Sequence, residues 1–238
     1  EAAISISCAH FRNQHLEADV LLAIDTATKT MGIAVHDGSS VLAEITWTGT
    51  GYHTVELAPE IAMVLKRIGS SIEHVTAAAV ASGPGSFTGL RIGMALAKGL
   101  ALAHKLDLVG IPTHDILAKA QPALDEDMIA VIRAGRRRLS TVRYRWLESS
   151  WTAQEEPRNQ TFEELLGSLE TETVLCGEIS SDERRALEEH ALARPADPAL
   201  CVRRPAVLAD LGWQKIHEKK PGHPANLIPV YTRSASGL

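Results

Sequence analysis

The sequence predicts an α/β protein made of two related lobes, in each of which helices cover a mixed sheet. Three closely spaced apolar strands open the chain, and strands then alternate with helices, which is typical of a mixed sheet with parallel strands and covering helices. The second half opens with another strand, a glycine-containing turn and a strand. A chain of 238 residues accommodates one large domain or two small lobes, and this repetition favours two lobes with a cleft between them.

The first three strands are expected at Val20–Ile24, Met31–Val35 and Val41–Thr48, where apolar residues are concentrated. The links between them are the turn-prone segments Asp25–Thr30 and His36–Ser39. Because links this short leave no room for crossover helices, the three strands should form an antiparallel meander.

Apolar residues with the spacing of a helix first occur after the meander. Apolar residues three and four apart predict a helix over Val55–Ile68, in which Pro59 is tolerated only near the first turn. The other elements are expected, in chain order, as a strand at Thr76–Ala81, a helix at Phe87–His104, a strand at Leu108–Ile111, a helix at Asp115–Ala123, strands at Met128–Ile132 and Leu139–Trp146, a helix at Thr161–Leu169, a strand at Thr173–Cys176, and helices at Asp182–Ala193 and Arg204–Glu218. The stretch Arg194–Pro198 is expected to be a loop.

Composition and charge exclude several classes of protein. Aromatic residues make up only 4% of the chain, which fits poorly with modules that stack bases on aromatic platforms. The net charge of −5 argues against a chain that coats nucleic acid or anionic membrane with its whole surface. Three distant cysteines suit a reducing cytosol, and no apolar run approaches the roughly 20 residues needed to cross a bilayer. No two histidines lie four residues apart, so no helical metal pair is expected.

The segment Ala81–Arg91 follows an apolar strand and opens a helix. Gly83 and Gly85 let the backbone turn sharply, and Ser86 or Thr88 can cap a helix whose free N–H groups favour anions. The segment is not a P-loop, because no Lys-Ser/Thr follows, and it lacks the glycines of a nucleophile elbow. A structural turn and an anion site both stay open.

The same helix carries small residues at every fourth position, namely Gly89, Gly93, Ala97 and Ala101. Residues four apart share a helix face, so another backbone could approach closely there. The approaching surface is either the chain's own sheet or a partner subunit.

Two polar segments are further candidates. Asp25-Thr26-Ala27-Thr28 ends the first strand, where it serves either as a simple turn or as a site for a phosphate or a metal-bound water. Arginines crowd one expected hairpin, and Arg136, Arg137 and Arg138 either contact phosphates or form a solvated turn balanced by acidic neighbours.

Several segments together resemble the bacterial TsaB (YeaZ) family. They are Leu22–Thr28, Ser82–Gly93, Ala97–Ala101, Val109–Thr113 and Pro229–Arg233, of which the run Gly-Pro-Gly-Ser-Phe-Thr-Gly-Leu-Arg is highly specific. The resemblance implies the two-lobed ASKHA fold of actin, sugar kinases and Hsp70-type chaperones. We expect residues 1–19 to be a weakly ordered extension, residues 20–117 with 203–238 to form the N-lobe, and residues 118–202 to form the C-lobe.

The resemblance also implies a function. It points to a non-catalytic, cytoplasmic scaffold that forms a heterodimer with TsaD, its catalytic paralogue, and helps recruit a TsaE-like ATPase. Together these proteins place threonylcarbamoyladenosine next to the tRNA anticodon. The chain would meet tRNA only indirectly, would not contact membrane, and would form a homodimer where the partner is absent. No cofactor is firmly implied, although ATP or ADP at the subunit junction stays open.

The family pattern assigns roles to residues of this chain. The partner surface is expected on the helices Val55–Ile68 and Phe87–His104, at Leu57, Ile61, Leu65, Gly89, Gly93, Ala97 and Ala101. A degenerate nucleotide or phosphate loop is expected at Asp25, Thr26, Thr28, Gly83, Gly85, Ser86 and Thr88.

Two departures from catalytic relatives support the non-catalytic assignment. TsaD-like chains bind metal through two histidines four apart, and here only His114 stands there, with Ala118 in the second place. Catalytic relatives have an acidic second phosphate loop, where this chain has the cation Arg133.

Three alternatives remain open. The first is an ASKHA-type kinase or ATPase that uses Asp25, Thr26 and the Gly83–Gly89 turn. The second is a peptidase, for which no metal pair or catalytic triad can be named. The third is an RNA-binding module that acts through Arg136–Arg138.

Overall fold

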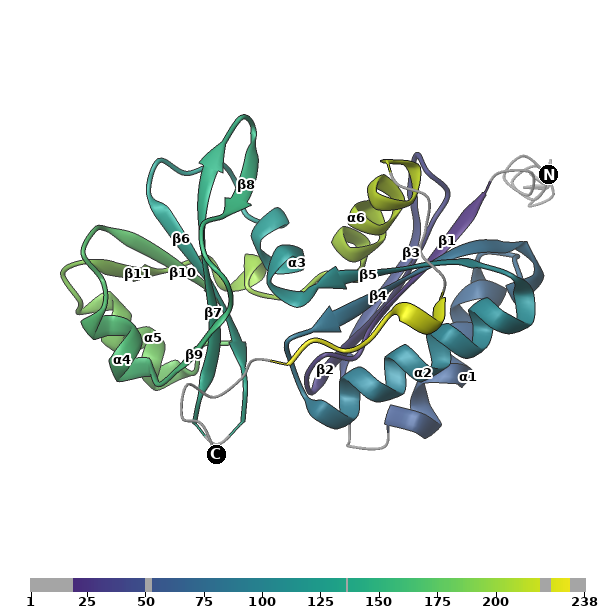
Figure 1. The fold of residues 1–238 in the computed structure, drawn as a ribbon, viewed down its shortest axis with the longest axis horizontal. Coiled ribbons are helices and arrows are strands. Elements are labelled where there is room, and N and C mark those ends of the chain that lie inside the picture. Colours follow the sequence, from purple (N-terminus) through teal and green to yellow (C-terminus); the bar gives the residue numbers. More distant parts are fainter. Residues whose placement is uncertain (1–18, 50–52, 136, 219–223, 232–238) are drawn as a thin grey trace, which may run out of the picture.

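The computed structural model describes residues 19–49, 53–135, 137–218 and 224–231. These residues form two mixed sheets covered by helices, as predicted, and the sheets lie side by side in Figure 1. Residues 1–18 of the expected extension lie outside the described part of the chain.

The first sheet has the order β3-β2-β1-β4-β5. Its strands are β1 (Val20–Asp25), β2 (Thr30–His36), β3 (Val41–Thr48), β4 (Val75–Gly83) and β5 (Asp107–Pro112). The first three are antiparallel neighbours, whereas β4 and β5 run parallel to β1. The predicted meander is therefore confirmed.

Three helices cover this sheet. Helices α1 (His53–Arg67) and α2 (Phe87–His104) pack on one face and α6 (Pro205–Glu218) packs on the other, as Figure 1 shows. Side chains alternate along β1: Leu22 and Ile24 belong to the core under α1 and α2, while Leu21 and Ala23 belong to the core under α6. A strand buried on both faces explains the continuous apolar run at this position. We call this sheet with α1, α2 and α6 the N-lobe.

The second sheet has the order β11-β10-β6-β7-β8, and β9 pairs with β7. Its strands are β6 (Asp127–Arg133), β7 (Leu139–Leu147), β8 (Ser150–Ala153), β9 (Arg158–Gln160), β10 (Thr173–Gly177) and β11 (Ala193–Pro195). Helices α4 (Phe162–Gly167) and α5 (Ser181–Glu188) lie beside it and complete what we call the C-lobe. The short helix α3 (Thr113–Lys119) packs against strands of both sheets.

The two sheets repeat one topology. Strands β8-β7-β6-β10-β11 match β3-β2-β1-β4-β5 position by position, with the same parallel and antiparallel pairs. Strand β6 is thus the counterpart of β1, so Arg133 at its end corresponds to Asp25. The strand-turn-strand repetition seen in the sequence reflects this shared topology.

Three strands differ from the prediction. β8 and β9 were not predicted, because they have only four and three residues and form by pairing with the longer β7. β11 occupies the start of the expected loop Arg194–Pro198, and α5 ends at Glu188 instead of continuing to residue 193. Pro195 is tolerated in β11 because this strand lies at the edge of the sheet.

Candidate functional site

A buried arginine joins the two lobes. Arg203 lies just before α6, and its Nε donates to Asp25 Oδ2 at 2.9 Å, at the end of β1. Its Nη1 donates to Glu178 Oε1 at 2.5 Å, directly after β10. Its Nη2 donates to the Thr28 hydroxyl at 2.7 Å and to the Thr30 carbonyl at 2.9 Å. We call Arg203, Asp25, Glu178 and Thr28 the inter-lobe cluster.

The charges of this cluster are compensated within the chain. The side chains of Arg203 and Asp25 are only 3% and 2% exposed. Burial opposes the charge of the guanidinium, but Asp25 and Glu178 outweigh it and raise the pKa of Arg203 above its ordinary value. The second carboxylate oxygen of Asp25 accepts from the Ala27 N–H at 2.8 Å. Both oxygens of Asp25 are therefore engaged.

Glu178 is engaged on both oxygens as well. Oε1 accepts from the Thr28 hydroxyl at 2.6 Å in addition to Arg203, and Oε2 accepts from the Arg133 N–H at 2.8 Å. The Arg133 side chain turns to Glu183 instead, with Nη1 at 3.0 Å from Oε1. The pKa of Glu183 is lowered, because the hydrogen bonds and charge of Arg133 and the Ser180 hydrogen bonds outweigh the effect of its burial.

The ASKHA fold implies a magnesium–nucleotide complex at this boundary, and the residues present do not fit one. Magnesium needs oxygen ligands in octahedral geometry, whereas here a guanidinium contacts both carboxylates. Within the described part of the chain, no group of three or more His, Cys, Asp or Glu is arranged to hold a metal.

The glycine-rich turn packs against the Asp25–Thr28 loop. The Ser86 N–H donates to the Ala27 carbonyl at 2.6 Å, and a Cβ on Gly85 would lie 2.2 Å from that oxygen. Gly83 has φ +113°, a conformation that favours glycine. The Ser86 hydroxyl caps α2 by accepting from the Gly89 N–H at 3.3 Å, as predicted. These contacts support the structural alternative for the turn.

A cleft of about 920 Å³ lies between the lobes beside the cluster. Thr28, Gly85 and Ser86 of the expected phosphate loop line it, and Lys29 and Arg133 also line it. Asp25, Thr26, Gly83 and Thr88 do not line this cleft.

The small-residue stripe faces inward, which corrects the prediction that it forms the partner surface. A Cβ on Gly89 would lie 2.2 Å from the Thr26 carbonyl oxygen, and one on Gly93 would lie 2.2 Å from the Thr26 hydroxyl. Ala97 and Ala101 are buried in the core. The stripe lets α2 approach the chain's own β1 and its following loop, where the Thr26 hydroxyl donates to the Gly89 carbonyl at 2.7 Å.

The expected α1 contacts are also buried. Leu57, Ile61 and Leu65 belong to the core under α1 and α2 and reach the surface only at the floor of a groove. They cannot form an exposed partner surface by themselves, because their side chains fill the chain's own interior.

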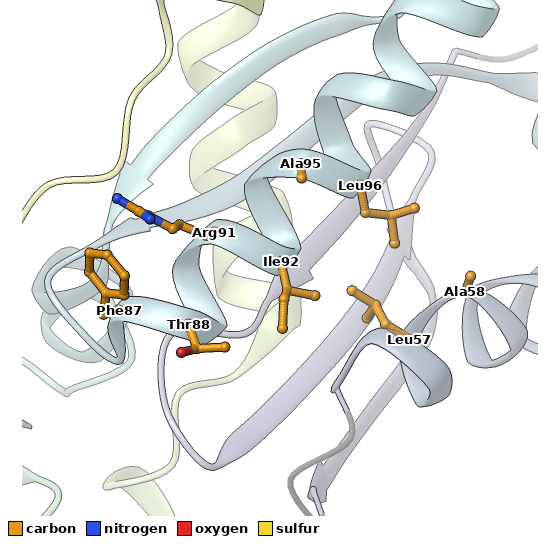
Figure 2. Close-up of a pocket in the computed structure, with 8 residues that line it drawn as sticks. All are labelled: Leu57, Ala58, Phe87, Thr88, Arg91, Ile92, Ala95 and Leu96. Atoms are coloured by element: carbon orange, nitrogen blue, oxygen red, sulfur yellow. The ribbon is translucent and has the colours of Figure 1, made fainter.

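The exposed sides of α1 and α2 form that apolar groove, which Figure 2 shows. It has a volume of about 550 Å³ and is lined by Leu57, Ala58, Phe87, Thr88, Arg91, Ile92, Ala95 and Leu96. Ile92 and Leu96 point toward α1, whereas Phe87 and Arg91 point away from it. A second hollow of about 420 Å³ continues the groove along Ala62 and Leu100. We call both together the α1–α2 groove.

Apart from Leu57 and Thr88, the residues that line the hollow in Figure 2 were not predicted from the sequence as site residues. Their signal is a second set of positions on α2, at Thr88, Ile92, Ala95 and Gly99, which lies on the face opposite the buried glycines. Both faces carry small residues, so spacing alone does not decide which one is exposed.

Of the three arginines Arg136, Arg137 and Arg138, the structure shows Arg138 with polar partners. Arg136 lies outside the described residues. Arg138 donates to the Asn159 side chain at 2.8 Å and lies 3.6 Å from Glu164. Arg137 is exposed, with φ +61°. The pairing of Arg138 supports the alternative of a turn balanced by acidic neighbours.

His114 is buried on α3 and its ring nitrogen Nε2 lies 3.0 Å from the Ser140 carbonyl oxygen. Ala118, one turn further, is also buried and supplies no second ligand. Burial lowers the pKa of His114 to about 4.

Fold and site together define a class: a two-lobed ASKHA-like protein in which the chain's own arginine lies between the two carboxylates at the lobe boundary. Comparison with known proteins identifies the family within this class. Residues 40–195 match the family model described as "TsaD: tRNA N6-adenosine threonylcarbamoyltransferase". The chain is 32% identical over 167 residues to the tRNA threonylcarbamoyladenosine biosynthesis protein TsaB of Escherichia coli, covering 70% of this chain and 67% of that protein.

Two further comparisons indicate the same family. The TsaB protein of Bacillus subtilis is 27% identical over 220 residues, covering 90% of this chain and 94% of that protein. The solved structure of YeaZ from Pseudomonas aeruginosa matches with a TM-score of 0.73 at 21% identity, over 90% of this chain and 99% of that one. The chain belongs to the TsaB family.

Proposed function

We propose that this protein is a partner subunit in tRNA threonylcarbamoyladenosine biosynthesis, and that it docks through the α1–α2 groove. The single observation that carries the docking surface is the exposed apolar groove in Figure 2. Apolar grooves of this kind on soluble proteins mark interaction sites. The names of the E. coli and B. subtilis relatives support the pathway.

The partner we propose is a TsaD-like paralogue. The TsaD family model matches most of this chain, so the two proteins share an architecture. Related chains can pair in a pseudo-symmetric way through the same two helices, as subunits of homodimers do. In the absence of that partner, a second copy of this chain would occupy the groove.

We propose that the chain is not itself the catalyst. Arg203 bonds to both carboxylates of the inter-lobe cluster, and Ala118 stands where the buried His114 would need a second metal ligand. The paired carboxylates leave no ligands for a metal–nucleotide complex at the cluster, so any ATP or ADP would lie at the junction with the partner. We place recruitment of a TsaE-like ATPase and contact with tRNA on the assembled complex in the cytoplasm. No described helix is long and apolar enough to cross a membrane.

The experiment substitutes an outward residue of α2. Ala95→Arg places a long cation in the groove without touching the core, because Ala95 is exposed. We expect the affinity for a cognate TsaD-like subunit, measured by titration calorimetry, to fall about a hundredfold. The matched control is Ala153→Arg on β8 of the C-lobe, where Ala153 is also exposed.

Unchanged affinity of Ala95→Arg, at unchanged melting temperature, would contradict the groove as the docking surface. Equal losses in both variants would point to a general effect of the added charge. Gly93→Arg would not be a fair test, because Gly93 packs on Thr26 and the variant would disturb the fold.

A further inference from the structure

The strongest feature outside the groove is the cation held between the two lobes. Asp25 belongs to the N-lobe and Glu178 to the C-lobe, and Arg203 bonds to both. The resemblance to the ASKHA fold implies that catalytic relatives bind a metal–nucleotide complex at this boundary. We propose that Arg203 is a built-in cation that replaces such a ligand and holds the lobes together without it.

The guanidinium suits this role because of its shape. It offers five N–H donors in a rigid plane, and here four of its contacts reach four different residues, Asp25, Thr28, Thr30 and Glu178. A divalent ion could not approach the two carboxylates unless Arg203 left. At 3% exposure, Arg203 has no room to swing into solvent without opening the boundary.

The backbone fixes Arg203 to the N-lobe. It is two residues before Pro205, the first residue of α6, and α6 packs on the first sheet. A Cβ on Gly32 of β2 would lie 2.8 Å from Pro205 Cγ, so this segment lies tightly against the strand. The reach of Arg203 to Glu178 therefore ties the C-lobe to a rigid part of the N-lobe.

The neighbouring arginine supplies the matched control. Arg204 pairs with Glu44 on β3, but its side chain is 54% exposed and its partner lies in the same lobe. Exposed ion pairs contribute little, whereas removing one partner of a buried group leaves uncompensated charge. Arg203→Ala should lower the melting temperature by about 10 °C, and Arg204→Ala by at most about 3 °C.

The decisive readout is metal dependence. Without its guanidinium, the Arg203→Ala variant presents two carboxylates and the Thr28 hydroxyl to a small space, which are hard oxygen ligands. We expect millimolar Mg²⁺ or methylguanidinium to raise the melting temperature of Arg203→Ala. Neither should shift the wild-type chain or Arg204→Ala. Arg203→Lys keeps the charge but not the planar donors, and should melt between the wild-type chain and Arg203→Ala.

Three results would overturn the proposal. The first is an Arg203→Ala variant that melts at the same temperature as Arg204→Ala. The second is an Arg203→Ala variant whose melting temperature neither Mg²⁺ nor methylguanidinium raises. The third is a wild-type chain whose melting temperature rises with Mg²⁺, with or without ATP, or which binds Mn²⁺ by electron paramagnetic resonance. If Arg203→Ala does not fold, the proposal is still tested by the melting of the wild-type chain with Mg²⁺ and by the melting temperature of Arg203→Lys. These measurements use the chain alone, so they do not depend on whether the groove binds a partner.

Discussion

His114 shows how burial sets the state of one side chain. A carbonyl oxygen only accepts hydrogen bonds, so the contact with Ser140 places the ring proton on Nε2. Burial is the main cause that lowers the pKa of His114 to about 4, and the nearby Arg203 acts in the same direction. The Ser140 carbonyl and Glu178 oppose this shift without cancelling it. The imidazole is thus neutral at physiological pH and fills space between the sheets.

This state predicts a pH dependence of stability. The unfolded chain takes up a proton on His114 near pH 6.5, whereas the folded chain does so only near pH 4. Stability is therefore complete above pH 6.5 and falls as the pH drops toward 4, by a total on the order of 3 kcal/mol. His114→Gln should flatten the curve of unfolding free energy measured by urea between about pH 5 and 6.5. Parallel curves for the two proteins would refute this role.

The carboxylate of Asp127 affects stability in a lower pH range than His114 does. Hydrogen bonds from Arg145 and Arg143 outweigh burial and lower the pKa of Asp127 below its ordinary 3.8. Its contribution is present above that pH and is lost only as the pH falls further. The two effects can therefore be separated along the pH axis.

At the scale of elements, helix α2 has two different faces. Gly93 lies against Thr26, whereas nothing lies within 4 Å of a Cβ built on Gly99. The inward face brings the helix close to the β1 loop, and the outward face borders the α1–α2 groove.

Replacement by alanine should have opposite effects on the unfolding free energy at Gly93 and at Gly99. Gly93→Ala forces a Cβ against the Thr26 hydroxyl and should cost about 2 kcal/mol of unfolding free energy. Gly99→Ala removes a flexible residue from an open position in the helix and should add about 0.5–1 kcal/mol. Urea unfolding of both variants checks this pair. A similar effect at the two positions would mean that the two faces are not distinguished as described.

The sequence predicts well those elements that carry a clear apolar pattern within their own residues. β3 and α2 have the bounds that their apolar patterns predict, because each carries several turns or alternations of one type. β9 has three residues and no apolar pattern, so only its pairing with β7 defines it. Local periodicity cannot show what a distant strand will pair with.

The candidate site, like the short strands, depends on contacts between residues that are distant in sequence. The small-residue spacing correctly indicates a close approach to α2, but it does not say whether the approaching backbone is Thr26 or a partner. Arg203 belongs to no motif, and its partners Asp25 and Glu178 lie 178 and 25 residues away in sequence. Only the folded arrangement of both lobes brings these charges together.

At the scale of the whole molecule, the repeated topology raises the question of whether the lobes unfold together. The chain has four tryptophans, and each lobe carries two of them. Trp47 on β3 and Trp213 on α6 form the N-lobe pair, while Trp146 on β7 and Trp151 on β8 form the C-lobe pair. Replacing one pair by phenylalanine leaves fluorescence that reports on the other lobe alone.

We expect the two lobes to unfold in a single transition as long as Arg203 joins them. The buried cluster connects the end of β1 to the end of β10, so neither lobe can unfold without exposing charges that the other compensates. Urea transitions followed through the N-lobe pair and through the C-lobe pair should therefore coincide, which is a standard test of two-state behaviour. Adding Arg203→Ala to both reporters should separate the midpoints, whereas adding Arg204→Ala should leave them together. Separate midpoints in the presence of Arg203 would show that the lobes are stable independently and that the cluster aligns them without coupling their stability.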